Sequence, residues 1–464
     1  MFDKSYGVND VEDRKGNNET NEDRAVQDSS NVGSSISFKS ILKSLGPGII
    51  TGSADDDPSG IATYSQAGAS FGFGMLWMAL YQFPLMTIIQ EICARIGLIT
   101  GDGLAAVIKK KYSNRVALPL ATLLLIANTI NIGADIGAMG AAVKLVIPQI
   151  PFVLATLIFT TFILLIQILV PYRRYVKVLK FLTLSLFAYI ATAIIVGGNA
   201  YDLLKATIIP HIEFSPEFAM MFVAIFGTTI SPYLFFWQTS EEAEEEVKKN
   251  KIPEINVGTP KVSKKEIKLM KTDVAIGMFF SQLIMWSIIV TTAGSLHSHG
   301  ITDVQSSEQA AKSLEPVVKS FPYSGQISKI IFALGIIGTG LLAVPILAGS
   351  SAYALSDTFG WKEGLSKNFK QAKAFYLVIA VSTIIGLWIN FSNIDPIKAL
   401  VYTAVINGVT AVPMLFIIMK IANDKNILGD RINGRVKNTL GWATFVIMAT
   451  AVVIMFVTFF YKPL

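Results

Sequence analysis

Three consecutive aspartates inside an apolar stretch are the residues of this sequence that most clearly indicate chemistry. The stretch 46–70 contains the run Asp55-Asp56-Asp57-Pro58-Ser59-Gly60. A carboxylate inside a membrane helix costs about 2.5–3.5 kcal/mol even on permissive insertion scales, and proline removes a backbone donor and clashes with the preceding turn. We therefore predict that residues 57–60 are unwound, which is tolerated at this depth only where protein or a watery cavity surrounds the backbone.

A second break is predicted in the stretch 217–240, whose apolar run is interrupted by Thr228, Thr229, Ser231, Pro232 and Tyr233. A single proline would be weak evidence, because kinks are common in membrane helices. Two breaks at corresponding places are typical of an inverted-repeat transporter with a binding site at the membrane midplane. Free carbonyls and the C-terminal ends of half-helices provide negative potential for a cation. Asp57, directly before the first break, is the best candidate ligand.

The elements that must position these residues are membrane-spanning helices. The chain is 52% apolar and only 16% charged, whereas soluble domains are about 25% charged. Eleven mainly apolar stretches have the length of roughly 20 residues that crosses a bilayer: 46–70, 72–98, 116–146, 151–170, 176–199, 217–240, 272–295, 326–356, 372–391, 396–420 and 437–461. The sequence therefore predicts an all-α membrane protein with two repeats of five spans, about 46–199 and 217–420, and an eleventh span.

Positive charge is distributed unequally over the two sides of these spans. Of the 39 lysines and arginines, 32 lie on one side, in the N-terminal tail, at Arg95 and in loops 99–115, 171–180, 241–271, 357–373 and 420–437. Since the basic side is cytoplasmic, we expect the N-terminus inside and the C-terminus outside. Residues 1–43 are expected to form a disordered cytoplasmic tail. Residues 44–464 are expected to form the transporter domain. A nucleic-acid partner is not expected, because the charges lie on separate short loops.

The stretch from Gly46 to Leu104 resembles the natural resistance-associated macrophage protein (Nramp) family of divalent-metal transporters. Asp57-Pro58-Ser59-Gly60 corresponds to the family's Asp-Pro-Gly-Asn, and the residues 67–72 and 90–102 are similar to the family's pattern. Looser matches at Asp135 and at 332–361 extend the resemblance over about 44–420. The resemblance implies a leucine-transporter-like 5+5 inverted repeat with an extra eleventh span, and a divalent metal bound between spans one and six.

Departures from the family pattern indicate which metal is carried. The family's asparagine is Gly60 here, and its Met-Pro-His in span six is Ser231-Pro232-Tyr233. Thioether sulfur favours soft transition metals, whereas carboxylate, carbonyl, hydroxyl and water oxygens suit Mg²⁺, Ca²⁺ and Mn²⁺. Mg²⁺ dehydrates reluctantly and usually keeps several waters. We therefore expect a roomier, all-oxygen site that carries Mg²⁺, with Mn²⁺ as a second substrate, as in the Nramp-related magnesium transporters that the chain resembles.

Proton coupling is expected to be weak or absent. Of the family's proton-path residues only Asp135 has a match, because the neighbouring acidic position falls near Ala138. His211, His297 and His299 are all predicted in outward loops, so none of them can relay protons inside a span. The His297-Ser298-His299 pair is interpreted as incidental rather than as a metal site.

The predicted metal site comprises Asp57, Gly60, Thr228 and Ser231, and the candidates for a vestibule or proton path are Asp55, Asp56, Asp135, Tyr233 and Asn407. Asn128, Asn131 and Asp135 share one helical face, for which hydrogen bonds between helices are favoured. Glu91 and Arg95 are expected to form a structural pair. Asp102 is expected to cap a short cytoplasmic helix. The Glu-rich segment 241–246 is expected to be a solvated helix that continues span six, with an acidic collar that attracts cations as the alternative.

Other classes of function are less well supported. One alternative is a conventional proton-coupled Mn²⁺/Fe²⁺ transporter, and another is a transporter of an organic solute such as an amino acid on the same fold. Three consecutive aspartates argue against an anionic substrate. A metal sensor is disfavoured because the cytoplasmic loops are too short for a signalling domain. An enzyme is not expected, because the sequence has no Gly-rich phosphate loop, HExxH or CxxC motif. No cofactor and no obligate protein partner are implied beyond the metal ion and the lipid bilayer.

Overall fold

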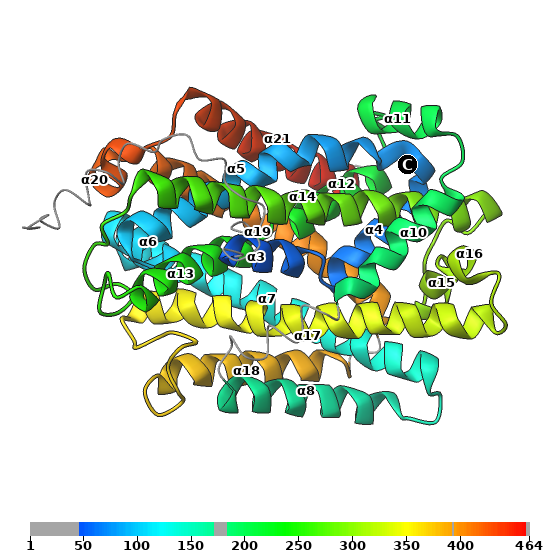
Figure 1. Cartoon of the computed structure of the whole chain (residues 1–464), viewed down its shortest axis with the longest axis horizontal. Helices are drawn as coiled ribbons and strands as arrows, with labels where there is room; N and C mark the ends of the chain where they lie inside the picture. Colours follow the sequence, from blue (N-terminus) through cyan, green and yellow to red (C-terminus); the bar gives the residue numbers. More distant parts are fainter. Residues whose placement is uncertain (1–45, 171–182, 392–393, 461–464) are drawn as a thin grey trace, which may run out of the picture. The chain divides into compact units, whose positions relative to one another are not determined.

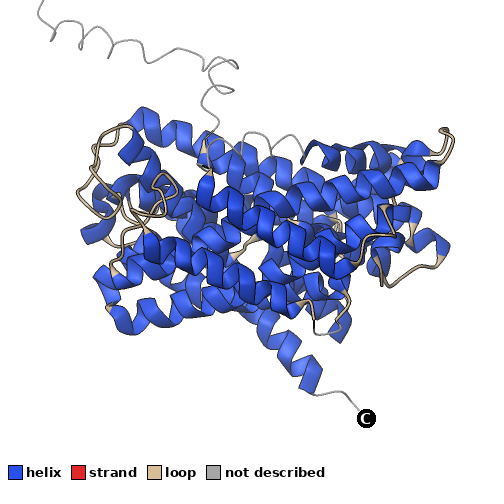
Figure 2. Cartoon of the chain, turned by 90° about the horizontal axis from the view of Figure 1, so that it is seen from below, coloured by secondary structure: helices blue, strands red, loops and turns tan. Residues whose placement is uncertain are grey.

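The computed structural model describes residues 46–170, 183–391 and 394–460, and these residues are almost entirely helical (Figures 1 and 2). Within these ranges, β-pairing is limited to one isolated bridge between Glu254 and Val257. The predicted tail 1–43, the loop 171–180 and the start of span five lie outside the described residues.

The first five spans are built from α3 Pro47–Asp55 with α4 Pro58–Phe71, α5 Trp77–Thr100, α7 Asn114–Val146, α8 Phe152–Leu169 and α10 Phe187–Val196. The next five are α12 Pro216–Thr229 with α13 Pro232–Lys248, α14 Lys264–Ser295, α17 Ser324–Phe359, α18 Lys373–Ile389 and α19 Pro396–Ala422, and the eleventh is α21 Arg435–Phe460. Shorter helices lie between them: η1 Gly72–Met75, α6 Leu104–Tyr112, η2 Thr183–Leu186, α11 Ala200–Ile208, η3 His297–His299, α15 Ser307–Lys312, α16 Glu315–Val318, α20 Lys425–Leu428 and η4 Gly429–Arg431.

Length and apolarity support membrane crossing for most of these helices. In the described part of the chain, eight helices pass on their own, or nine if η2/α10 and α11, which are bent by 118° at their junction, count as one span. The broken pair α3/α4 and the shorter apolar helix α18 correspond to the remaining predicted spans. The all-helical prediction with spans one and six broken is therefore confirmed.

The two breaks have the same local cause. Both second half-helices begin with proline at their first position, Pro58 in α4 and Pro232 in α13. Proline is favoured there because its missing N–H would have no partner in the helix and its φ is already helical. The residues directly before, Asp57 and Ser231, have extended backbone and occupy the N-cap positions. Each break is therefore determined by one proline and the extended residue directly before it.

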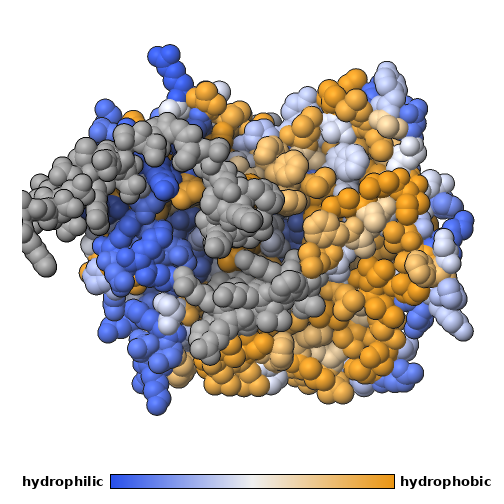
Figure 3. All heavy atoms as spheres, viewed as in Figure 1, coloured by the Kyte–Doolittle hydropathy of each residue, from blue (hydrophilic) through white to orange (hydrophobic). Residues whose placement is uncertain are grey.

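The broken helices lie in the interior of the bundle (Figure 1). α3 and α4 contact α14, while α12 contacts α19, and α13 contacts α5 and α17. α3 and α14 approach closely because both carry glycine at the contact: a Cβ on Gly52 would overlap the Gly277 carbonyl. Figure 3 shows an apolar surface over the helices and a hydrophilic end near α6 and α20. This apolar surface suits contact with lipid.

Two expectations at the hydrophilic end are corrected. The Glu-rich segment continues α13 to Lys248 as predicted, but it is not solvated, since Glu241, Glu242, Glu244 and Glu246 are at most 5% exposed. Glu244 accepts hydrogen bonds from the Tyr353 hydroxyl and the Leu365 N–H. Tertiary contacts with α17 and the following loop therefore bury carboxylates that the sequence pattern places in water.

Asp102 does not cap α6. The N-cap is Gly103, and Asp102 instead pairs with Lys110 at 2.6 Å. The N-terminal turn of α6 is bound by Asp357 at the end of α17, which accepts a hydrogen bond from the Ala106 N–H. The expected structural pair of Glu91 and Arg95 is confirmed by an ion pair at 3.3 Å.

Candidate cation site between the broken helices

The Asp57 carboxylate is fixed at the first break by the start of α4. Its Oδ1 accepts hydrogen bonds from the Ser59 hydroxyl at 2.6 Å and from the Gly60 N–H at 2.7 Å. Its Oδ2 accepts a hydrogen bond from the Asn131 amide of α7 at 3.1 Å. The side chain is 1% exposed. Asp57 is therefore a buried, oriented carboxylate with one oxygen turned toward α7.

Thr228 faces Gly60 across the two breaks. A Cβ built on Gly60 would lie 3.2 Å from Thr228 Oγ1 and 3.1 Å from the Asp55 carbonyl oxygen. The Thr228 hydroxyl is buried, and the hydroxyl of Tyr64 is its polar neighbour. The structure thus brings Asp57, Gly60 and Thr228 of the predicted set together, with the carboxylate and hydroxyl oxygens on the two sides of Gly60.

Ser231 has a different immediate role. Its hydroxyl donates to the carbonyls of Gly227 and Thr228, both at 2.7 Å, and so satisfies two of the last carbonyls of α12. Its own oxygen keeps lone pairs that can face a ligand. Ser231 therefore lies beside the break, with its proton committed to the end of α12.

Tyr233 connects the two broken helices directly. Its hydroxyl donates to the Ala54 carbonyl of α3 at 3.0 Å, a group that the end of α3 leaves without a helical partner. This bond is a structural link between α13 and α3. It occupies Tyr233, which the sequence analysis treats as a candidate for a vestibule or proton path.

A polar chain leads from Asp57 into α7. Asn131, which donates to Asp57, also lies 3.4 Å from Asp135 Oδ2. The Asn131 and Asp135 Oδ1 atoms are both buried without a partner in the protein. Asn128, on the same face, donates to Leu347 O and to two serine hydroxyls of α17. The expected bonding between helices is therefore seen for Asn128 and also for Asn131, which donates from α7 to the N-cap of α4. Asn131 is in addition a direct neighbour of the candidate site, where it was not predicted.

The remaining candidates lie around this centre. Asp55 accepts a hydrogen bond from Ser281 of α14, and Asp56 lines a cavity between α3, α10 and α14. Asn407 is buried on α19, which packs against α4 and α7, and neither polar atom of its amide has a partner in the protein. Asp55 and Asp56 thus face away from the Asp57–Asn131 contact.

The donors at the breaks are oxygen atoms of one carboxylate, hydroxyls, an amide and carbonyls, which is the set that suits a hard cation. Among the described residues, no group of three or more His, Cys, Asp and Glu side chains is arranged to hold a metal. The three histidines make separate contacts: His297 with the Ala69 carbonyl, His299 with the Ser295 carbonyl and His211 with Glu213.

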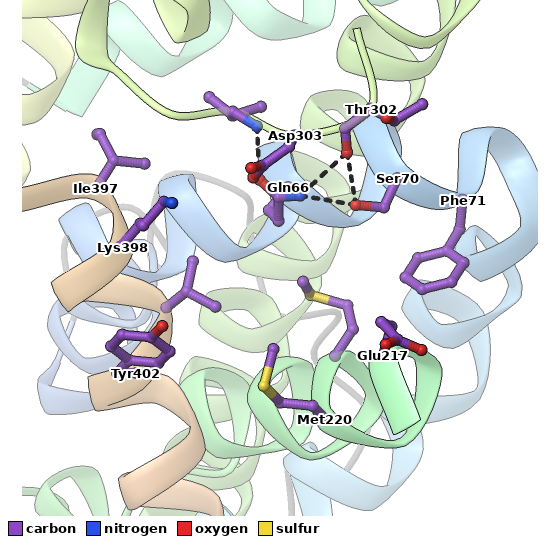
Figure 4. Close-up of a pocket in the computed structure, with 13 residues that line it drawn as sticks. Gln66, Ser70, Phe71, Glu217, Met220, Thr302, Asp303, Ile397, Lys398 and Tyr402 are labelled. Carbon is purple, nitrogen blue, oxygen red and sulfur yellow. Dashed lines mark hydrogen bonds between the residues drawn. The ribbon is translucent and has the colours of Figure 1, made fainter. Parts of the chain in front are cut away.

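A pocket of about 330 Å³ lies farther along α4 (Figure 4). Ser70 and Gln66 of α4 both donate to the Thr302 carbonyl, and Gln66 accepts from the Val304 N–H at 2.8 Å. Glu217, Met220 and Tyr402 line the other walls. Gln66 is nine residues from Asp57, or roughly 13 Å along the helix at 1.5 Å per residue. The pocket is therefore separate from the break at Asp57.

The sequence is similar over most of its length to a known family of transporters. The family profile described as "Natural resistance-associated macrophage protein-like" matches residues 48–458. The divalent metal cation transporter MntH of Klebsiella pneumoniae is 25% identical over 429 residues, which cover 90% of this chain and 95% of the relative.

Solved structures show the same fold. The Eremococcus coleocola manganese transporter has a TM-score of 0.70 at 17% identity, covering 93% of this chain and 91% of that chain. MhsT in complex with L-phenylalanine has a TM-score of 0.57 at 11% identity, covering 89% of this chain and 98% of that chain. These structural similarities confirm the leucine-transporter-like fold class. The family profile, which matches residues 48–458, identifies a multi-pass transporter rather than an enzyme. The chain belongs to the Nramp family of divalent metal transporters.

Proposed function

We propose that this protein carries a hard, partly hydrated divalent cation, Mg²⁺ with Mn²⁺ as a second substrate, by alternating access past Asp57. The single observation that carries the proposal is the set of oxygen atoms that meet at Gly60: the Asp55 carbonyl and the Thr228 hydroxyl face this residue, and the Asp57 carboxylate accepts its N–H. A site whose donors are all oxygen atoms suits a hard ion such as Mg²⁺ or Mn²⁺. Ser231, in place of the family's methionine, supplies no sulfur.

Weak or absent proton coupling is part of the proposal. The Tyr233 hydroxyl, at the place of the family's histidine, is bonded to a backbone carbonyl, and a tyrosine does not titrate near neutral pH in its usual range. Asp135 contacts Asn131 rather than a second acidic group. The supporting observation is thus a polar chain with one carboxylate at each end and no histidine between them.

The N-terminus is proposed to be cytoplasmic and the C-terminus outside.

Two other functions remain as alternatives. The first is a proton-coupled carrier of Mn²⁺ and Fe²⁺; MntH and the Eremococcus coleocola protein are named as divalent metal and manganese transporters, which favours Mn²⁺ as a carried ion. MhsT was solved with an amino acid, which favours an organic solute on the same fold. The buried run Asp55–Asp57 disfavours a substrate with a carboxylate, because the negative charges would repel it.

Uptake into proteoliposomes tests the proposal. Liposomes containing the purified protein are given Mg²⁺, Mn²⁺ or Cd²⁺, and internal dyes report metal and pH. Entry of Mg²⁺, competition by excess Mg²⁺ against Mn²⁺, and no acidification beyond leak are expected. The hard-ion proposal is wrong if Mn²⁺ or Cd²⁺ enters readily while excess Mg²⁺ neither enters nor competes. A thermal-shift panel of amino acids and metals distinguishes a metal carrier from the organic-solute alternative, because only the ligand that binds raises the melting temperature.

A further inference from the structure

A second cavity lies beside the first break, on the side of α3 that faces α14. It has a volume of about 190 Å³ and lies between α3, the start of α10 and α14. Its polar lining comes from Ser53, Asp56 and Ser281, and its walls are apolar. Asp57 points to α7 through Asn131, whereas Ser281 of α14 binds Asp55. The three consecutive carboxylates therefore serve two different faces of the broken helix.

Asp56 is the residue that makes this cavity chemically distinct. Its side chain is 3% exposed and lines the cavity, and its Oδ1 has no hydrogen-bond partner within the protein. The neighbouring Asp55 Oδ1 is likewise buried without a partner. Burying an ionised carboxylate is costly unless a partner charge or hydrogen bonds compensate it. No lysine, arginine or histidine is among the residues that line this cavity, so its chemistry fits a cation and excludes an anion.

We propose that this cavity is a second position for the transported divalent cation, held by Asp56 and the hydroxyls of Ser53 and Ser281. This inference rests on the proposed function, because it needs an ion that reaches the break. The cavity has room for several water molecules, so a partly hydrated ion fits. Asp56 is also the C-cap of α3, where the negative end of the helix dipole favours a cation. In the proposed orientation the cavity is on the cytoplasmic side of the break.

The two positions are occupied in turn rather than together. Asp56 and Asp57 are consecutive residues, so their Cα atoms are about 3.8 Å apart. Two divalent ions held by adjacent residues repel each other in a medium of low dielectric constant. The ion therefore leaves Asp57 as it reaches Asp56, and Asp56 acts on the release step more than on the first binding step.

Transport kinetics test this assignment. Mg²⁺ uptake into proteoliposomes is compared for the wild type, Asp56→Asn and the control Asp202→Asn, an exposed carboxylate on α11. Asp56→Asn is expected to lower the maximal rate at least tenfold and to change the half-saturating Mg²⁺ concentration less than about threefold, while Asp202→Asn changes neither. A wild-type rate in Asp56→Asn overturns the inference, and so does an equal loss in Asp202→Asn.

Anomalous scattering from Mn²⁺ locates the position. With Asp57→Asn, a Mn²⁺ peak is expected in the cavity beside Asp56, and Asp57→Asn combined with Asp56→Asn is expected to remove it. An empty cavity in Asp57→Asn overturns the inference. If the wild type binds Mn²⁺ at Asp57 while the cavity stays empty, the proposed function survives and the second position does not. If the wild type neither takes up Mg²⁺ nor binds Mn²⁺ at Asp57, the proposed function itself is wrong. Should Asp57→Asn not fold, the kinetics of Asp56→Asn decide alone.

Discussion

Replacing Gly60 by alanine would fill the space between the two breaks while adding only one methyl group. The new Cβ would lie 3.1 Å from the Asp55 carbonyl oxygen, 3.2 Å from Thr228 Oγ1 and 3.4 Å from a ring carbon of Tyr64. These contacts are tight but require shifts of only a few tenths of an ångström. Gly60 has a helical backbone in the first turn of α4, so alanine is sterically allowed there.

The effect on stability is expected to be small because two contributions oppose each other. Replacing glycine inside a helix gains up to about 1 kcal/mol, whereas overpacking a buried site costs about 1–3 kcal/mol. The net loss is therefore about 0–3 kcal/mol by the same principles. One kcal/mol shifts the melting temperature by roughly 2–4 °C in chains of 150–250 residues, so Gly60→Ala should melt within a few degrees of the wild type.

Transport should change much more than stability. The methyl group would displace the Asp55 carbonyl and the Thr228 hydroxyl, which are candidate ligands beside Asp57, and Mg²⁺ demands near-ideal octahedral geometry. We expect Mg²⁺ uptake by Gly60→Ala to fall by about tenfold, which corresponds to about 1.4 kcal/mol, and Mn²⁺ uptake to fall less. Proteoliposome uptake and a melting curve measure both quantities on the same preparation.

Gly335→Ala is the matched control, because a Cβ there meets its nearest atom, a Ser185 hydroxyl oxygen, at an ordinary 3.6 Å. It should leave both uptake and melting unchanged. Wild-type Mg²⁺ uptake by Gly60→Ala would refute the idea that the Asp55 carbonyl and the Thr228 hydroxyl are ligands of the ion. A collapse in melting temperature would show instead that the contact estimate is wrong.

Three further changes give distinct outcomes. Gly52→Ala should lower the melting temperature by many degrees, because its Cβ would overlap the backbone of Gly277, and retention of wild-type melting would contradict the close contact of α3 and α14. Ser231→Met adds a thioether at the break, so Cd²⁺ should compete with Mn²⁺ uptake more strongly than in the wild type; unchanged competition would place residue 231 away from the ion. Burial and the neighbouring carboxylates raise the pKa of Glu363, in the loop between α17 and α18, well above its usual range. Because the folded pKa is above the unfolded one, its contribution to stability is complete below the usual glutamate pKa and is lost as pH rises through the raised value. Glu363→Gln should therefore flatten the decline of melting temperature from pH 5 to pH 8, Asp202→Asn should not, and a wild-type slope in Glu363→Gln would contradict the burial of that carboxyl.

The spans and the two breaks could be predicted because their causes are local. Apolar length fixes a span, and one proline with one polar residue before it fixes a break. The same reasoning could not orient the three aspartates, which are consecutive in sequence. Asp57 turns toward α7 because it caps α4 and meets Asn131, 74 residues later. The only signal for that contact was the four-residue spacing of Asn131 and Asp135 on one helical face.

The wrong expectations all concern contacts between distant segments. Asp102 has the sequence position of a helix cap, but Asp357 occupies the N-terminal turn of α6 from 255 residues away. The run of glutamates after span six is typical of a solvated helix, yet Tyr353 and the loop after α17 bury Glu244. Partners of this kind depend on tertiary packing, and no periodicity in a single segment encodes them.

The central claim is that a divalent cation binds between Asp57 and Thr228 without a soft ligand. Anomalous maps of the wild-type protein with Mn²⁺, recorded with and without a large excess of Mg²⁺, test it most directly. A Mn²⁺ peak in the gap between Asp57 and Thr228 that disappears under excess Mg²⁺ is the predicted result. A peak that persists under excess Mg²⁺ would contradict the preference for a hard ion, and a peak elsewhere in the bundle would contradict the site.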